Sequence, residues 1–252
     1  MSKQLIMEFQ RYTDQKRLQF ISSMLKQTIT EGAEVLDIGC GNGIITRSLG
    51  HAGFNVLGVD VSDKAIEKAR LLNKLSNVRF EVRSAEQLVA DGQHFEAIIC
   101  SEVLEHLHQP VNLLKVLRKV LKENGILIVT VPNGNGGREL LVTKPVQAIM
   151  KYFPFCWKML NNVKRMLGYK GTTVQSDADD LSHVQFFTNE SLSALASSSG
   201  FRITHWGKSN FIEDVFPFSL LTKRVRKLQQ LDCRVAEILP LKMTGGFFTV
   251  WQ

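Results

Sequence analysis

The chain has 252 residues, of which 44% are hydrophobic and 22% charged, a composition that excludes a disordered chain and a disulfide-stapled miniature protein. No charge-free apolar run approaches the roughly 20 residues that span a bilayer, and Glu8 and Arg11 interrupt the N-terminal apolar stretch, so we expect neither a membrane channel nor an export signal. The four cysteines are scattered without a Cys-x-x-Cys pair, which indicates reduced thiols and a cytoplasmic location.

The net charge of +7 is unevenly distributed along the chain. Residues 1–132 carry 16 Lys and Arg against 15 Asp and Glu, a net of +1, whereas residues 133–252 carry 15 against 9, a net of +6. If this basic surplus serves a partner such as a phosphate or an anionic membrane, the C-terminal half contacts that partner. Ordinary solubility is the alternative explanation.

Strands and helices alternate through the first half of the sequence. In chain order we predict a helix over residues 9–25, a strand over 34–39, a helix over 43–49, a strand over 55–60, a helix over 63–75, strands over 78–82 and 95–100, a helix over 111–121 and a strand over 126–131. Strands over 201–207 and 245–251, with a helix before them from residue 188 to Gly200, complete the pattern. This alternation predicts an α/β fold with a doubly wound, mostly parallel sheet of seven strands.

The second half of the sequence contains two departures from this pattern. After the fifth strand we predict a helical insertion over residues 134–182, in which Lys144 to Lys170 contains six basic and no acidic residues among many apolar ones. Such a segment is typical of a lid over the acceptor or of contact with a membrane surface. Nucleic-acid binding is disfavoured because only one of the six is Arg. A second helical and basic insertion, over residues 211–243, either extends the same surface or forms a homodimer.

Ligands of a doubly wound sheet bind at the carboxyl ends of its strands, and the loop after the first strand carries Gly39, Gly41 and Gly43. Alternating glycines allow the backbone to approach a ligand closely. The dinucleotide fingerprint requires glycine where Ile44 stands, and no Walker loop is present. The pattern therefore indicates a nucleoside ligand without a pyrophosphate, whose ribose hydroxyls Asp60 can bind. A tight turn without a ligand is the alternative.

Four motifs in register carry a family resemblance: Val35–Gly43, Gly58–Asp60, Ser101–His106 and Gly125–Asn133. Together they resemble the class I S-adenosylmethionine-dependent methyltransferases. The nearer likeness is to the branch that contains the ubiquinone-biosynthesis O-methyltransferases, and a more distant one is to the small-RNA 2′-O-methyltransferases. The resemblance implies a Rossmann-like fold and S-adenosylmethionine as the cofactor.

The resemblance also implies which residues bind this cofactor. The methionine end would lie against the first glycine loop and the tip of the fourth strand, the ribose against the end of the second strand, and the adenine against the residues that follow the second and third strands. The implied residues are Asp37, Gly39, Gly41, Asp60, Val61, Ala85, Glu86, Ser101 and Glu102. For Glu86, a solvated loop carboxylate is an equally open interpretation.

The segment Glu102-x-x-Glu105-His106 is the candidate for chemistry on the acceptor. On one helical turn, two carboxylates and an imidazole would converge and could hold a hard cation. The resemblance implies Mg²⁺ or another divalent cation at these residues, with His183 as a further ligand, although imidazole suits Mn²⁺ or Fe²⁺ better. Alternatively, no metal is bound and the histidine acts as a base or orders the loop. Glu105, His106 and His183 are the predicted catalytic residues.

These expectations define four regions and one function. Residues 1–30 form a helical cover, 31–133 the cofactor-binding core, 134–182 the lid, and 183–252 complete the sheet. We expect a methyltransferase that methylates a hydroxyl of an amphipathic small molecule, a lipid or a lipid-linked sugar, with peripheral contact at the inner membrane surface. The alternatives are an enzyme similar to the small-RNA 2′-O-methyltransferases and a non-catalytic, cofactor-binding scaffold.

Overall fold

The computed structural model describes residues 11–136, 184–213, 218–222 and 225–252. Most of the predicted insertion over residues 134–182, together with His183, lies outside these residues. Everything below concerns the described part of the chain.

A seven-stranded sheet forms the centre of the molecule, in the order β3-β2-β1-β4-β5-β7-β6. Its strands are β1 (Glu34–Ile38), β2 (Asn55–Asp60), β3 (Val78–Val82), β4 (Phe95–Ser101), β5 (Leu121–Pro132), β6 (Ile203–Lys208) and β7 (Gly246–Trp251). The strands β1 to β5 pair in parallel, whereas β7 runs antiparallel to both β5 and β6. The predicted doubly wound, mostly parallel sheet is confirmed.

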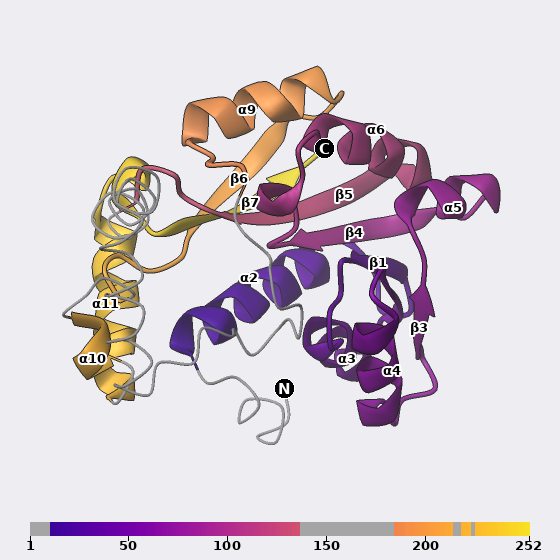
Figure 1. The fold of residues 1–252 in the computed structure, drawn as a ribbon, viewed down its shortest axis with the longest axis horizontal. Coiled ribbons are helices and arrows are strands. Elements are labelled where there is room, and N and C mark those ends of the chain that lie inside the picture. The colour runs from indigo at the N-terminus through magenta and orange to yellow at the C-terminus, as the bar shows by residue number, and fades with distance from the viewer. Residues whose placement is uncertain (1–10, 137–183, 214–217, 223–224) are drawn as a thin grey trace, which may run out of the picture.

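Helices cover both faces of the sheet (Figure 1). One face carries α2 (Tyr12–Thr28), α3 (Ile44–His51) and α4 (Asp63–Leu72), and the other carries α5 (Ala85–Ala90), α6 (Pro110–Val120) and α9 (Asn189–Ser198). Two further helices, α10 (Phe218–Thr222) and α11 (Arg226–Ile238), lie at one end of the molecule, beyond α2. Among the helices that the structure describes, none combines the length and apolarity needed to cross a membrane.

Two hydrophobic clusters hold these layers together. The first joins α2, α3 and α4 to the sheet through fully buried residues such as Leu18, Ile21 and Ile66. The second joins α5, α6 and α9 to the opposite face through Leu117 and the indole of Trp251. Because the central strands are buried on both faces, their sequences are continuous apolar runs rather than alternating ones, which is why they were recognisable without a structure.

Several predicted boundaries differ from the observed ones by a few residues, and local contacts explain two of them. β5 begins at Leu121 rather than at residue 126, because Leu121 pairs with Phe95 before a register shift in the β4–β5 ladder. α4 ends at Leu72 rather than at residue 75, because Asn73 is extended and its side-chain amide donates to two backbone carbonyls, those of Leu75 and Val78. An asparagine that satisfies backbone groups in this way competes with the helix.

Candidate functional site

The carboxyl ends of the parallel strands meet at one edge of the sheet. The strand order reverses between β1 and β4, whose helical connections lead to opposite faces. In open α/β sheets this switch point leaves a crevice outside the strand ends, where ligands bind. The loops that follow β1, β2, β3, β4 and β5 lie at this edge, and most of the predicted site residues are in these loops or at the ends of the strands that precede them.

The loop after β1 is a stretch of bare backbone at this edge. Gly39, Gly41 and Gly43 have φ angles of 68°, 53° and 74°, the left-handed region that side chains disfavour. Space imposes the same requirement, because a Cβ on Gly39 would lie 2.6 Å from a methyl carbon of Val103, and one on Gly43 would overlap the ring of Phe80. The loop therefore presents peptide groups and no side chain at its three glycines, and at Gly39 and Gly43 there is also no space for one.

Asp60, the last residue of β2, fastens this loop to the neighbouring strand. One carboxylate oxygen accepts a hydrogen bond from the backbone N–H of Gly41 at 2.9 Å, and the other accepts from the N–H of Ser62 at 2.9 Å. A carboxylate has about four acceptor positions, so two remain after these bonds. Asp60 can thus order the glycine loop and still bind ligand hydroxyls.

Asp37 lies beneath the same loop and is almost completely buried, with 2% exposure. The hydroxyl of Thr46 donates to its carboxylate at 2.6 Å. Burial, opposed by hydrogen bonds from Thr46 and assisted by the nearby negative charge of Asp60, raises the pKa of Asp37 to about 7. Two carboxylates so close together favour a cationic ligand, because a positive charge relieves both burial and repulsion.

Glu102, directly after β4, has a strained backbone. Its φ angle is 57°, the only positive value among the described non-glycine residues. Its N–H donates to the carbonyl of Thr130, and its carboxylate accepts from the Thr130 hydroxyl at 3.0 Å. Strain of this kind costs about 1–3 kcal/mol and collects at functional sites. The strand end therefore holds a carboxylate in a fixed direction beside the crevice.

Arg17 is a site residue that the sequence interpretation missed. It belongs to α2, and its guanidinium lies 3.2 Å from the Glu102 carboxylate and 2.7 Å from that of Asp14. Its side chain is almost fully buried. The sequence signal was a basic residue inside an amphipathic helix next to Leu18, which is common on surface helices and gave no reason to place it at the site.

Glu105 and His106 lie on the short 3₁₀ turn Leu104–His106 that follows. Glu105 is 1% exposed, and neither of its carboxyl oxygens has a hydrogen-bond partner among the residues that the structure describes. Burial raises its pKa well above the ordinary value, Glu102 raises it further, and Arg17 opposes this effect. The imidazole Nε2 of His106 lies 3.9 Å from the Glu105 carboxyl and remains partly exposed.

The helical turn predicted to join Glu102, Glu105 and His106 comprises only Leu104–His106, so Glu102 lies outside it. The left-handed backbone at Glu102 separates it from the turn that contains the other two, and its carboxylate is directed to Arg17 and Thr130. Within the ranges that the structure describes, no group of three His, Cys, Asp or Glu side chains could hold a metal ion. The described residues alone therefore do not form the implied cation site, and because His183 lies outside them the metal site stays a prediction.

The structure places the remaining predicted cofactor residues along the same edge. Val61 follows Asp60 and is 77% exposed, which is unusual for an apolar side chain. Ala85 is buried at the start of α5, whereas Glu86 beside it is exposed. The hydroxyl of Ser101 lies 2.9 Å from that of Thr130. The position of Glu86 agrees with a solvated loop carboxylate.

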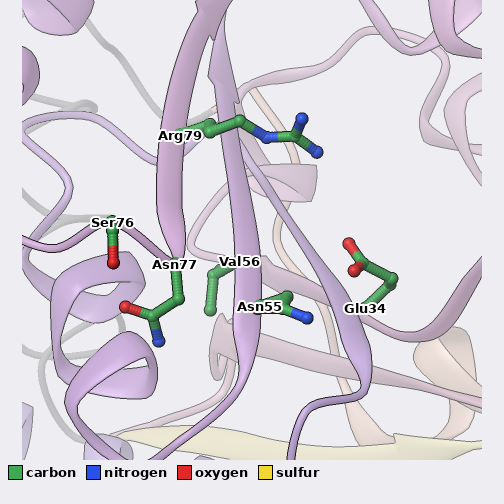
Figure 2. A pocket seen from close by; sticks show the side chains of 6 residues that line it. All are labelled: Glu34, Asn55, Val56, Ser76, Asn77 and Arg79. Carbon is green, nitrogen blue, oxygen red and sulfur yellow. The ribbon is translucent and has the colours of Figure 1, made fainter.

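A pocket at the opposite edge of the sheet does not belong to this site (Figure 2). It lies at the amino ends of the first three strands and is lined by Glu34, Asn55, Val56, Ser76, Asn77 and Arg79. The amide of Asn77 donates to the carbonyls of Gly50 and Phe54, and that of Asn55 donates to Gly32. These groups hold loops in place, so the pocket is structural.

Comparison with known proteins agrees with the site geometry. A family model described as a methyltransferase domain matches residues 9–206, a range that includes α2 and every strand-end loop described above. Curated relatives include the ubiquinone biosynthesis O-methyltransferase of Roseobacter denitrificans, 29% identical over 126 residues, which are 49% of this chain and 51% of the relative. The same-named protein of Xanthomonas axonopodis pv. citri is 30% identical over 141 residues, 55% of this chain and 58% of the relative.

The chain thus spans about half the length of the curated relatives that it matches. Two solved structures share its fold over most of its length. The magnesium protoporphyrin IX methyltransferase of Synechocystis, solved with bound S-adenosylhomocysteine, has a TM-score of 0.54 at 16% identity and covers 95% of this chain and 83% of its own. The 1,6-didemethyltoxoflavin-N1-methyltransferase of Burkholderia thailandensis has a TM-score of 0.56 at 16% identity and covers 95% and 79%.

Proposed function

This chain belongs to the methyltransferase-domain family, and from that premise we propose that it transfers the methyl group of S-adenosylmethionine to a hydroxyl oxygen of an amphipathic small molecule. One arrangement carries the proposal: a glycine loop without side chains, fastened to Asp60 and lying over the buried Asp37 at the switch point of the sheet. This arrangement suits a nucleoside with a cationic end and no pyrophosphate.

Each part of the cofactor has a matching group at this edge. The ribose hydroxyls donate to the acceptor positions that Asp60 retains, and the exposed side chain of Val61 packs against the adenine. The cationic methionine end lies over Gly39 and Gly41, near the carboxylate of Asp37, beside Ser101 and Glu102. Bare backbone allows the ligand to come within hydrogen-bonding distance of peptide groups that a Cβ would shield.

The reaction is an in-line displacement at the methyl carbon. A lone pair of the acceptor oxygen forms the new carbon–oxygen bond as the carbon–sulfur bond breaks, which leaves S-adenosylhomocysteine, and the hydroxyl proton passes to a base. Because the sulfonium already activates the methyl group, positioning supplies most of the rate. We derive no step through a metal ion, since the described residues do not fit one.

His106 is the base that the geometry supports. Its imidazole is partly exposed on the 3₁₀ turn beside the crevice and lies 3.9 Å from the Glu105 carboxyl. The hydroxyl proton passes to this imidazole, and the Glu105 carboxyl beside it can orient the ring without ionising. Glu105 is therefore a partner of the base rather than a base itself, because burial favours its neutral form. His183 stays a predicted catalytic residue from the sequence.

Two observations support an amphipathic acceptor. The curated relatives are named for ubiquinone biosynthesis and share about half of this chain, and the segment over residues 138–172 is apolar and basic. A lipid or a lipid-linked sugar is also amphipathic and would be an acceptor of the same kind.

A transfer assay tests the proposal. The protein is incubated with S-adenosylmethionine and, in separate arms, an alkylated catechol, a short RNA duplex and no acceptor, and release of S-adenosylhomocysteine is measured. We expect release with the catechol only. Release with RNA alone would favour an enzyme similar to the small-RNA 2′-O-methyltransferases. A protein that binds the cofactor but releases nothing with any hydroxyl acceptor would be a scaffold, and the proposal would be wrong.

A further inference from the structure

The helices α10 and α11 present apolar side chains to solvent at one end of the molecule (Figure 1). Each of these side chains is between 37% and 87% exposed. They are Phe218, Leu221, Val225, Leu228, Leu231 and Ile238, which we call the apolar stripe. Single exposed apolar residues are normal, but a contiguous set along a helix pair marks an interaction surface.

The stripe is one face of an amphipathic helix whose other face is already packed. Leu228, Leu231 and Ile238 recur at intervals of three and seven residues, so they lie on the same side of α11. The opposite side buries Gln229, Cys233 and Ala236, and Asp232 is buried at its border. The Asp232 carboxylate accepts from the backbone N–H groups of residues 211, 212 and 213. These bonds fix the orientation of α11, which therefore cannot turn its stripe inward without breaking them.

The charges beside the stripe are predominantly positive. Arg226, Lys227 and Arg234 are exposed on α11. Of the two acidic residues of this helix, Asp232 is buried with its backbone donors, and Glu237 forms an ion pair with Lys16 at 2.6 Å. An apolar stripe flanked by exposed cations is complementary to a surface that has anionic groups on the outside and an apolar layer beneath them.

We infer that the α10–α11 face docks on the surface of an anionic phospholipid bilayer. Apolar side chains of the stripe enter the boundary between headgroups and acyl chains, while Lys227 and Arg234 contact the phosphates. A second copy of this chain is a poorer occupant, because a two-fold interface would set the same cations of both copies against one another. The occupant is therefore a lipid surface, identified by its charge and its apolar interior.

The docking face is connected to the site through α2. The backbone N–H of Tyr12 donates to the Gln229 side chain at 2.9 Å, and the Lys16 ammonium donates to the carbonyl of Cys233 at 3.3 Å. The same helix carries Arg17 to Glu102. A protein that docks through α11 thus holds α2, and with it the proposed site, close to the membrane. This part rests on the proposed function, because only an amphipathic acceptor benefits from it.

Co-sedimentation with vesicles tests the inference on the full chain. Vesicles of phosphatidylcholine with phosphatidylglycerol are compared with vesicles of phosphatidylcholine alone. We expect binding to the anionic vesicles that weakens with added salt, and a loss of about ten-fold or more in the variant L231E/I238E, because burying two apolar side chains becomes burying two charges. The matched control is L71E/L72E, which changes two exposed leucines on α4; it should bind like the wild type.

Three results would overturn the inference. The first is a wild type that does not bind anionic vesicles. The second is a variant L231E/I238E that binds them as well as the wild type does. The third is a dimer in light scattering that L231E/I238E abolishes. Circular dichroism checks that the variant is folded, and K227Q/R234Q, which removes charge without touching the stripe, should also bind anionic vesicles more weakly. Binding of S-adenosylmethionine is measured in parallel. A variant that no longer binds vesicles but still binds S-adenosylmethionine separates this inference from the proposed function.

Discussion

The guanidinium of Arg17 lies 3.2 Å from the carboxylate of Glu102, which joins the N-terminal helix α2 to the end of β4. Arg17 is almost fully buried, and Glu102 keeps a left-handed backbone. The helix α2 is thereby linked to the strand end where we propose that the cofactor and the acceptor meet. The ion pair makes the position of α2 part of the site geometry.

Removing either member of this pair should therefore affect the other. We expect R17Q and E102Q each to lower the free energy of unfolding, and the double variant to lose less than their sum, with a coupling of about 1–3 kcal/mol, since the pair is only partly screened by water. Urea denaturation of the four proteins measures this coupling. Strictly additive losses would show that the two side chains do not interact.

The glycine at position 39 should be required for two separable reasons. Gly39→Ala introduces a Cβ at a positive φ and against Val103, so we expect it to destabilise the fold by more than the roughly 1–2 kcal/mol of the backbone effect alone. The matched control is Gly92→Ala, where φ is 66° but no atom lies within 4 Å of the added Cβ. Equal losses in thermal denaturation would argue against the close contact with Val103.

Glu105 should make the protein less stable as pH rises. Burial raises its pKa in the folded state, so its contribution is fully present below the unfolded pKa of about 4.3 and is lost as pH rises towards the folded value. Glu105→Gln keeps a neutral side chain at every pH. We expect E105Q to gain stability relative to the wild type between about pH 5 and pH 8 in urea denaturation.

The exposed Glu86 provides the control for this measurement, because E86Q removes the same charge from a solvated position. A gain that E105Q shows and E86Q lacks is therefore specific to the buried position. If E105Q differed from the wild type by a constant amount, the Glu105 carboxyl would have an ordinary pKa in the folded protein.

Cofactor affinity should depend on the ionisation of Asp37. Its pKa is about 7 in the cofactor-free protein, and a cation beside it favours the ionised form, so binding releases a proton. Affinity for S-adenosylmethionine should then rise with pH, by up to about ten-fold per unit below pH 7, and level off above it. Calorimetry across this range reads the slope. Asp37→Asn should bind weakly with no such slope, and a wild-type profile as flat as that of D37N would contradict the assignment.

The sheet was predictable because local sequence carries its signals. The runs Val35–Ile38 and Val56–Val59 are buried on both faces, and only continuous apolar strands separated by helices satisfy that environment. The glycines after β1 were informative for the same reason, since their conformation is local. Asp60 lies at the strand-end edge because its position depends only on the end of β2, and its contact with the ribose stays a prediction.

The Arg17–Glu102 pair and the orientation of Glu102 were not predictable. Both depend on contacts between α2 and β4, which are far apart in sequence, and no local pattern signals a left-handed glutamate. The segment Glu102–His106 favoured a continuous helical turn, yet the bonds of Glu102 to Thr130 on β5 override that preference. The alignment of two strand ends, rather than local propensity, decides the geometry there.

The most direct test of the central claim is calorimetric titration of S-adenosylmethionine into the wild type, D60A and D63A. Asp63 is an exposed carboxylate three residues further along, so D63A changes the same charge without touching the glycine loop. We expect saturable binding by the wild type and D63A, and a loss of about 1–3 kcal/mol in D60A, which removes the ribose acceptor and the bond to Gly41. A wild type that does not bind, or a D60A variant that binds equally well, would contradict the claim that this edge of the sheet holds the cofactor.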